Sequence, residues 1–161
     1  MGVNSMIEIQ PPKKFLATQN PIFTIFLAGS IEMGQSHDWQ RDFCNHLAPL
    51  DPKGNLVILN PRRYDWDSTW TENDPRFIKQ VEWELRGLEL CNGIFMYLDP
   101  KTKSPISLLE LGLYAKSKKL VVICPDGFWR KGNVKTVCER YGVKMYNSLE
   151  AAVEVITTCF G

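Results

Sequence analysis

The sequence of 161 residues lacks the long apolar segments that mark membrane-spanning and secreted proteins. A transmembrane helix needs about 18 or more consecutive apolar residues, and no such run is present. The first residues, MGVNSMIEIQPPKK, have no apolar core of the kind that signal peptides carry. Five cysteines are scattered without C-x-x-C spacing, which is typical of a reducing compartment. We therefore expect a cytoplasmic protein that neither spans nor binds a membrane.

An excess of charge of one sign is also missing. The chain has 19 Lys and Arg against 18 Asp and Glu, which gives a net charge of +1. A polymer such as DNA or RNA is bound through a clear surplus of positive charge. The composition therefore argues against a nucleic-acid partner, and any anionic partner should be small.

Several motifs of cofactor and nucleophile chemistry are absent. The chain contains neither G-x-G-x-x-G, nor the lysine of a phosphate-binding P-loop, nor the G-x-S-x-G of a serine hydrolase. His37 and His46 are its only histidines, too few for a histidine metal site without help from carboxylates. We expect an activity that requires no metal and no redox cofactor.

What the sequence does contain is a regular alternation of apolar runs and amphipathic segments. Residues 1–20 are polar and proline-bearing and are interpreted as an N-terminal arm, followed by a single domain over residues 21–161. The expected strands are IFTIFLA, NLVILNP, GIFMYLDP, KLVVICP and VKMY, and segments with helical spacing separate them. This β-α alternation predicts a parallel sheet with helices on both faces.

Parallel sheets bind ligands at the carboxyl ends of their strands. The segments that follow the first four expected strands are 29–34, 60–70, 99–107 and 125–133. The first, within AGSIEMG, contains Gly29, Ser30 and Gly34, and is either an anion-binding loop or an ordinary tight turn. Ser107 and Asn133 are further candidates for substrate binding.

The segment NPRRYDWDSTW follows the second expected strand. Arg62 and Arg63 could clamp a carboxylate or phosphate, and Trp66 and Trp70 could stack on a flat ring. The alternative is a surface loop whose aromatic side chains pack onto the core. Two tryptophans in a polar loop favour the substrate-binding interpretation.

Glu110 is the only charged residue between Ser104 and Ala115, in the leucine-rich helix expected from SPISLLELGLYA. Burial of an unpaired carboxylate costs several kcal/mol or raises its pKa. Glu110 is therefore either a structural carboxylate that pairs with a buried neighbour, or a functional carboxylate. In the second case, the loss of hydrating water keeps it nucleophilic. Glu84 lies at the edge of the apolar stripe of the preceding helix, where spacing alone is also consistent with a solvated residue.

Three blocks together resemble the nucleoside 2-deoxyribosyltransferase superfamily, including its deoxynucleoside 5′-monophosphate N-glycosidases. They are FLAGSIEMG, WELRGLELCNGIFMYL and SPISLLELGLYAKSKKLVVICP, and they cover about Phe23 to Pro125 in order. The resemblance implies a flavodoxin-like, doubly wound, five-stranded parallel sheet of order 2-1-3-4-5. It also implies a homodimer or larger homo-oligomer whose neighbouring subunits help to close each site.

The resemblance assigns roles to individual residues. The nucleophilic glutamate of the family's ELG motif falls on Glu110, and the acidic residue that faces the base falls on Glu84. The glycine-serine loop falls on Gly29, Ser30 and Gly34, and the serine that meets phosphate in the monophosphate glycosidases falls on Ser104. Two positions depart from the transferases: Phe26 stands where a tyrosine holds the nucleophile, and Ser104 stands where they carry an acid.

The function expected from this resemblance is cleavage of the N-glycosidic bond of a nucleoside or nucleotide through a covalent glycosyl-glutamate intermediate. The sugar would then pass to another base or to water, in purine or pyrimidine salvage. The alternatives are a 5′-monophosphate N-glycosidase that only hydrolyses and a non-catalytic nucleotide sensor. The expected partners are a small nucleoside or nucleotide and a free nucleobase.

Overall fold

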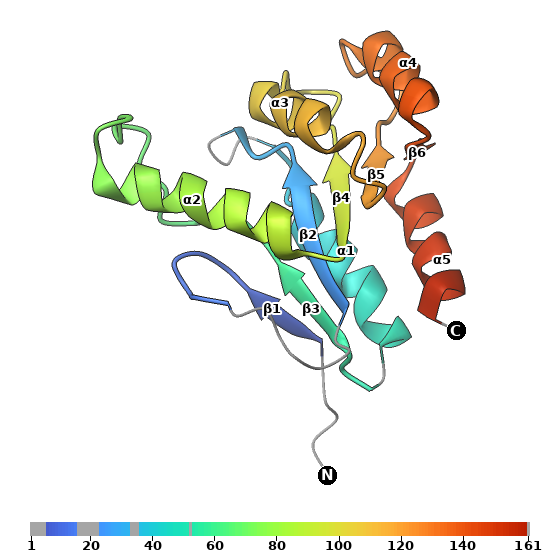
Figure 1. Ribbon diagram of the computed structural model, residues 1–161, viewed down its shortest axis with the longest axis horizontal. Coiled ribbons are helices and arrows are strands. Elements are labelled where there is room, and N and C mark those ends of the chain that lie inside the picture. Colours follow the sequence, from blue (N-terminus) through green and yellow to red (C-terminus); the bar gives the residue numbers. More distant parts are fainter. Residues whose placement is uncertain (1–5, 16–22, 33–35, 52, 161) are drawn as a thin grey trace.

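The computed structural model describes residues 6–15, 23–32, 36–51 and 53–160, with side chains as far as residue 156. These segments form a parallel α/β fold around one six-stranded sheet of order β1-β3-β2-β4-β5-β6 (Figure 1). The elements are β1 (Ile7–Ile9), β2 (Phe23–Gly29), α1 (Trp39–Leu47), a 3-10 turn (Ala48–Leu50), β3 (Leu56–Leu59), α2 (Pro75–Leu90), β4 (Gly93–Tyr97), α3 (Pro105–Tyr114), β5 (Leu120–Ile123), α4 (Lys131–Tyr141), β6 (Lys144–Tyr146) and α5 (Leu149–Phe160).

The edge strand β1 differs from expectation. The predicted sheet had five strands, but Ile7–Ile9 pairs in parallel with β3, so the strand count and the order were wrong at this edge. The remaining strands run β3-β2-β4-β5-β6. β1 was missed because its three residues are centred on Glu8 and are soon followed by Pro11 and Pro12, a pattern that resembles a loop. An edge strand tolerates this composition because only one side of it must pair.

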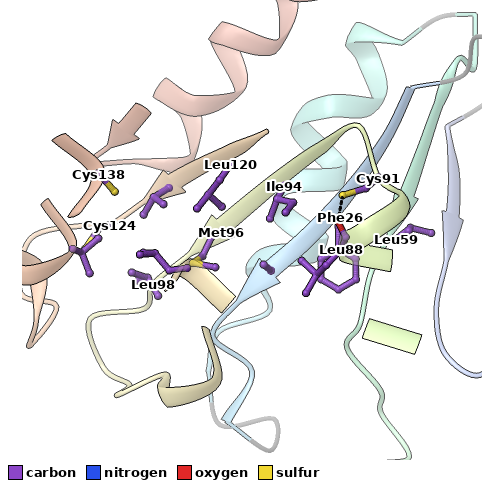
Figure 2. Packing of buried hydrophobic residues seen from close by; sticks show 14 of the residues in the cluster. Phe26, Leu59, Leu88, Cys91, Ile94, Met96, Leu98, Leu120, Cys124 and Cys138 are labelled. Atoms are coloured by element: carbon purple, nitrogen blue, oxygen red, sulfur yellow. Dashed lines mark hydrogen bonds between the residues drawn. The ribbon is translucent and has the colours of Figure 1, made fainter. Parts of the chain in front are cut away.

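Helices cover the sheet on both faces, as the alternation along β2 requires. Ile25 and Leu27 point toward the face covered by α1 and α5. Phe26 and Ala28 point toward the face covered by α2, α3 and α4, where they join the larger core cluster. Figure 2 shows part of this cluster, with side chains of β2, β3, β4 and β5 in one layer. Burial on both faces explains why the strands are almost continuously apolar.

Helix α2 packs directly on the Phe26 ring of the sheet, which the absence of a side chain at Gly87 allows. A Cβ atom at Gly87 would come within 2.7 Å of the Phe26 ring and 3.3 Å of a Leu59 methyl group. The helix begins at Pro75, and its N-cap Asp74 accepts a hydrogen bond from the backbone N–H of Arg76. In Figure 1, α2 and α3 lie on the same side of the sheet, with α1 behind it. None of the helices in the described ranges is both long and apolar enough to span a bilayer.

Candidate active site

Glu110 lies on the inner side of α3, in the second turn of the helix. Its side chain is 9 % exposed and has no hydrogen-bond partner within the part of the chain that the structure describes. Ser107 and Leu111 are buried on the same side of the helix. Burial raises the pKa of Glu110 to about 8, and the negative charge of Glu84 adds to the rise. This carboxyl group is therefore largely buried and has no hydrogen-bond partner in the described part of the chain.

Glu84 faces the same region from α2. Burial raises its pKa to about 7, and a hydrogen bond from Gln80 partly opposes the rise. The amide nitrogen of Gln80 donates to Oε1 of Glu84 at 2.7 Å and to the carbonyl oxygen of Pro61 at 3.1 Å. Because a carbonyl oxygen can only accept, the contact with Pro61 fixes which end of the Gln80 amide faces Glu84. Oε1 of Glu84 is therefore held as an acceptor.

The two carboxyl groups titrate as a pair, because each disfavours ionisation of the other. With pKa values of about 7 and about 8, the pair retains at least one proton near neutral pH. A site of this kind offers one carboxylate and one carboxylic acid at the same time. Chemically, it can supply a nucleophile to one atom and a proton to another.

A cluster of three buried hydroxyl groups lies between the carboxyl end of β2 and the start of α3. Oγ1 of Thr102 lies 3.0 Å from Oγ of Ser30 and 2.7 Å from Oγ of Ser104, and the two serine hydroxyls also contact each other. The Asp99 N–H donates to Ser30 at 2.8 Å. Ser30 and Ser104, both expected at the site, are thus brought together from positions 74 residues apart in the sequence. Thr102, which the sequence analysis did not single out, joins them.

Gly29 has a packing reason for being glycine. Its φ is +127°, and a Cβ atom there would lie 2.2 Å from the carbonyl oxygen of Tyr97 on β4. No side chain fits this position, so β2 and β4 can approach each other only with glycine here. Gly34, the other glycine expected in this loop, lies outside the described residues.

Arg62 is buried, and Nε and Nη2 of its guanidinium group are hydrogen-bonded within the protein. Its side chain is 5 % exposed and donates to Oε1 of Gln40, to Oγ of Ser36 and to the carbonyl oxygen of His37, each at 3.0 Å. A carboxylate oxygen of Asp38 lies 3.5 Å from Nε. The guanidinium group therefore holds residues 36–38, which lead from the glycine loop into α1.

Arg63 and the tryptophans form a second self-contained group. Arg63 makes a two-pronged pair with Asp65, at 2.9 and 2.7 Å, and also lies over the ring of Trp70. Trp66 packs edge-on against Trp70, with a centroid distance of 4.9 Å, and contacts Phe77 at the start of α2. Trp70 is 9 % exposed, and its indole N–H is buried without a partner in the described part of the molecule. The structure thus packs these aromatics against one another.

The remaining expected residues differ in their placement. Ser107 is buried on the inner side of α3, one turn before Glu110. Asn133 is exposed on α4. The described residues contain no group of three or more His, Cys, Asp or Glu side chains that could hold a metal ion.

Two further residues near the site were not found from the sequence. Gln80 precedes Glu84 by four positions, the spacing that lets side chains meet along a helix, and this spacing could have identified it. Glu32 lies inside AGSIEMG, and its Oε1 accepts the backbone N–H groups of Lys103 and Ser104, each at 2.7 Å. Only the folded chain brings these groups together.

Comparison with known proteins gave a family match and matches to solved structures. The family model described as "nucleoside 2-deoxyribosyltransferase like" matches residues 22–128. A crystal structure of a conserved protein from Enterococcus faecalis V583 has the same fold, with a TM-score of 0.60 and 11 % sequence identity. The alignment covers 83 % of this chain and 96 % of that one. No curated protein matches the sequence significantly.

Proposed function

Because the chain belongs to the nucleoside 2-deoxyribosyltransferase-like family, we propose that it cleaves the N-glycosidic bond of a nucleoside or nucleotide, with Glu110 as the nucleophile. The observation that carries this proposal is the pair of carboxyl groups on α3 and α2. Both pKa values are raised by burial, and Glu110 has no hydrogen-bond partner among the described residues. A carboxylate without structural partners is available to bond to a sugar carbon.

The reactive form of the pair has its proton on Glu84 and its charge on Glu110; because the pKa of Glu110 is the higher of the two, this is the less populated singly protonated form. In the first step, the carboxylate of Glu110 attacks C1′ of the sugar while the bond from C1′ to the base nitrogen breaks. The electron pair of that bond moves to the base, and the protonated carboxyl group of Glu84 gives its proton to the base. The product is an ester between Glu110 and C1′, with the free base beside it. The transition state has oxocarbenium character, so a dry carboxylate close to C1′ stabilises the developing positive charge.

In the second step, water or another nucleobase attacks C1′ and releases the Glu110 carboxylate. The ionised Glu84 accepts a proton from the incoming group, which restores both residues to their starting states. Attack by a base makes the enzyme a transferase in base salvage, and attack by water makes it a hydrolase. Gln80 supports both steps by holding Oε1 of Glu84, which leaves the other oxygen to exchange the proton.

A second copy of the chain is the occupant we propose for the exposed apolar side of α2 and α3. Ile106, Leu109 and Leu113 on α3 are about 60 % exposed, at positions that share one side of the helix. On α2, Ile78 and Leu85 are also exposed, and they lie seven positions apart, as Ile106 and Leu113 do on α3. Apolar surface gathered on two neighbouring helices is typical of subunit interfaces. Such an interface would lie beside Glu84 and Glu110 and would exclude water from them.

The test is incubation of the purified protein with 2′-deoxynucleosides and their 5′-monophosphates, with and without added adenine. Base exchange supports a transferase, and release of free base alone supports a hydrolase. Binding without turnover would leave only the nucleotide-sensor alternative. Glu110→Gln should abolish any turnover, whereas the matched control Glu82→Gln, an exposed glutamate on α2, should not. Size-exclusion chromatography with light scattering measures the oligomeric state and so tests whether a second copy of the chain binds to α2 and α3.

A further inference from the structure

A carboxylate of the protein itself occupies the backbone N–H groups at the start of α3. Oε1 of Glu32 accepts hydrogen bonds from the N–H groups of Lys103 and Ser104, each at 2.7 Å. Ser104 has a left-handed backbone with φ of +48°, and its side chain makes no hydrogen bond that caps the helix. Two successive N–H groups converging on one oxygen, at the positive end of a helix, form an arrangement that binds anions.

This point lies on the same side of α3 as the proposed nucleophile. Ser104, Ser107 and Glu110 follow one another at intervals of three residues, and all are buried, with 3 %, 4 % and 9 % exposure. At a rise of about 1.5 Å per residue, Ser104 is roughly 9 Å from Glu110 along the helix axis. A pentose with C1′ at Glu110 spans much of this distance. When the sugar lies along the helix, its 5′ substituent therefore points toward Glu32.

We propose that Glu32 selects an uncharged 5′-hydroxyl group and rejects a 5′-phosphate, which makes nucleosides the substrate class. The inference rests on the function proposed above. A phosphate at this position would need the N–H groups that Glu32 already occupies, and its charge would be repelled by the carboxylate. A 5′-hydroxyl group can instead donate a hydrogen bond to Glu32.

The groups around Glu32 support this selection. The hydroxyls of Ser30, Thr102 and Ser104 hydrogen-bond with one another. Arg62 is buried against residues 36–38, and Arg63 is paired with Asp65. The arginines that could have neutralised a phosphate are therefore engaged elsewhere. Lys103, which also lies at the start of α3, places its ammonium group over the ring of Trp129, 5.0 Å from the ring centroid, while Glu32 accepts the backbone N–H groups there.

The experiment measures binding of three probes that contain no base: 2-deoxyribose, 2-deoxyribose 5-phosphate and inorganic phosphate. Calorimetry is performed on the wild type, Glu32→Gln, Glu32→Ala and the charge control Glu139→Gln, whose site is exposed on α4. Glu32→Gln keeps an oxygen that can accept the two N–H groups, so its melting temperature should stay near that of the wild type. Glu32→Ala frees both N–H groups for a phosphate.

We expect the wild type and Glu139→Gln to bind the sugar phosphate no more tightly than the sugar. Removal of a like charge at close range should tighten binding of the sugar phosphate at least about tenfold in Glu32→Gln and Glu32→Ala. Inorganic phosphate should bind Glu32→Ala more tightly than the wild type. A wild type that prefers the sugar phosphate, or Glu32 variants that gain no affinity for either phosphate, would overturn the selection. These binding results are independent of turnover, so failure of the glycosidic chemistry is recognised separately, by inactivity of the wild type on all nucleosides and monophosphates.

Discussion

Two regions of the molecule keep their carboxyl groups in opposite surroundings. In the first, on α2 and α3, burial raises the pKa of Glu84 to about 7 and that of Glu110 to about 8. In the second, around the start of α2, hydrogen bonds from arginines lower the pKa of Asp65 and Asp74. The second region pairs its charges at the surface, and the first leaves Glu110 unpaired away from water.

The two regions differ in how their charged groups affect the stability of the folded state. An exposed ion pair contributes at most about 1 kcal/mol and is readily explained as surface structure. A buried acid without a partner destabilises the folded state, because its ionised form has lost its water. Nothing in the packing of α3 requires a carboxyl group at position 110. The function proposed above would account for its presence, and the following experiments test this distinction.

The largest expected effect is loss of turnover in Glu110→Gln. An amide cannot form the glycosyl ester, so kcat should fall by several orders of magnitude while the fold is retained. The matched variant from the other region is Asp65→Asn, which should keep wild-type kcat. Steady-state kinetics with the best nucleoside and circular dichroism measure both. More than about a tenth of the wild-type rate in Glu110→Gln, a barrier change below ~1.4 kcal/mol, would exclude this nucleophile.

Substitution of Glu84 should have a smaller effect that depends on the leaving group. General acid catalysis contributes about 10²- to 10⁴-fold, so Glu84→Gln should lose this factor for nucleosides whose base must be protonated. A substrate with an activated leaving group that departs as an anion should react at nearly the wild-type rate. Glu82→Gln, two positions away and exposed, is the control. Equal loss on both kinds of substrate would remove the proton-donor role of Glu84.

The two regions should also differ in how they link stability to pH. The pKa of Glu110 is about 8 in the folded chain and 4.5 as the ordinary value, so the folded state binds more protons in between. The contribution of Glu110 to the free energy of unfolding should therefore fall by roughly 3 to 5 kcal/mol as the pH rises from about 5 to 8, and Glu84, whose pKa is also raised, adds to this fall. Asp65 and Asp74 have lowered pKa values, so they affect stability only in acid, where they become protonated.

Urea denaturation at pH 5, 6, 7 and 8 measures this dependence. Glu110→Gln should flatten the curve markedly and should be more stable than the wild type at pH 8, because it carries no buried charge. Asp65→Asn should give a curve parallel to that of the wild type. A Glu110→Gln curve with the wild-type slope would show that Glu110 is not a buried acid.

The smallest expected effects distinguish the neighbouring arginines. Arg62→Ala removes buried hydrogen bonds to Gln40, Ser36 and His37 and should lower the free energy of unfolding by about 2 to 4 kcal/mol. Arg63→Ala removes a pair with the exposed Asp65 and should cost less than about 1 kcal/mol. Neither variant should weaken binding of monophosphates relative to nucleosides. A selective rise in KM for monophosphates in Arg63→Ala would indicate that this arginine contacts phosphate.

Much of the site could be predicted from local sequence and from family resemblance. Glu110 was identified because a single charge in a leucine-rich helix is conspicuous, and Glu84 because the resemblance pointed to it. Arg62 was expected at the substrate site, and the sequence could not show which side chains surround it. Its actual partners lie more than 20 residues away along the chain. Glu32 and Thr102 were missed because an isolated polar residue in a loop carries no periodic signal.

The sequence by itself determined the α/β alternation, the two apolar sides of β2 and the start of α2 at Asp74 and Pro75. These features depend on spacing and capping within a few residues, and such interactions form in the same way wherever the segment lies. The tertiary structure alone decided the edge strand β1, the effect of the Glu84 charge on the pKa of Glu110, and the hydrogen bonds of Glu32 at the start of α3. Each of these joins segments far apart in the chain, and their energies depend on distance and on exclusion of water, which arise only when the helices pack on the sheet.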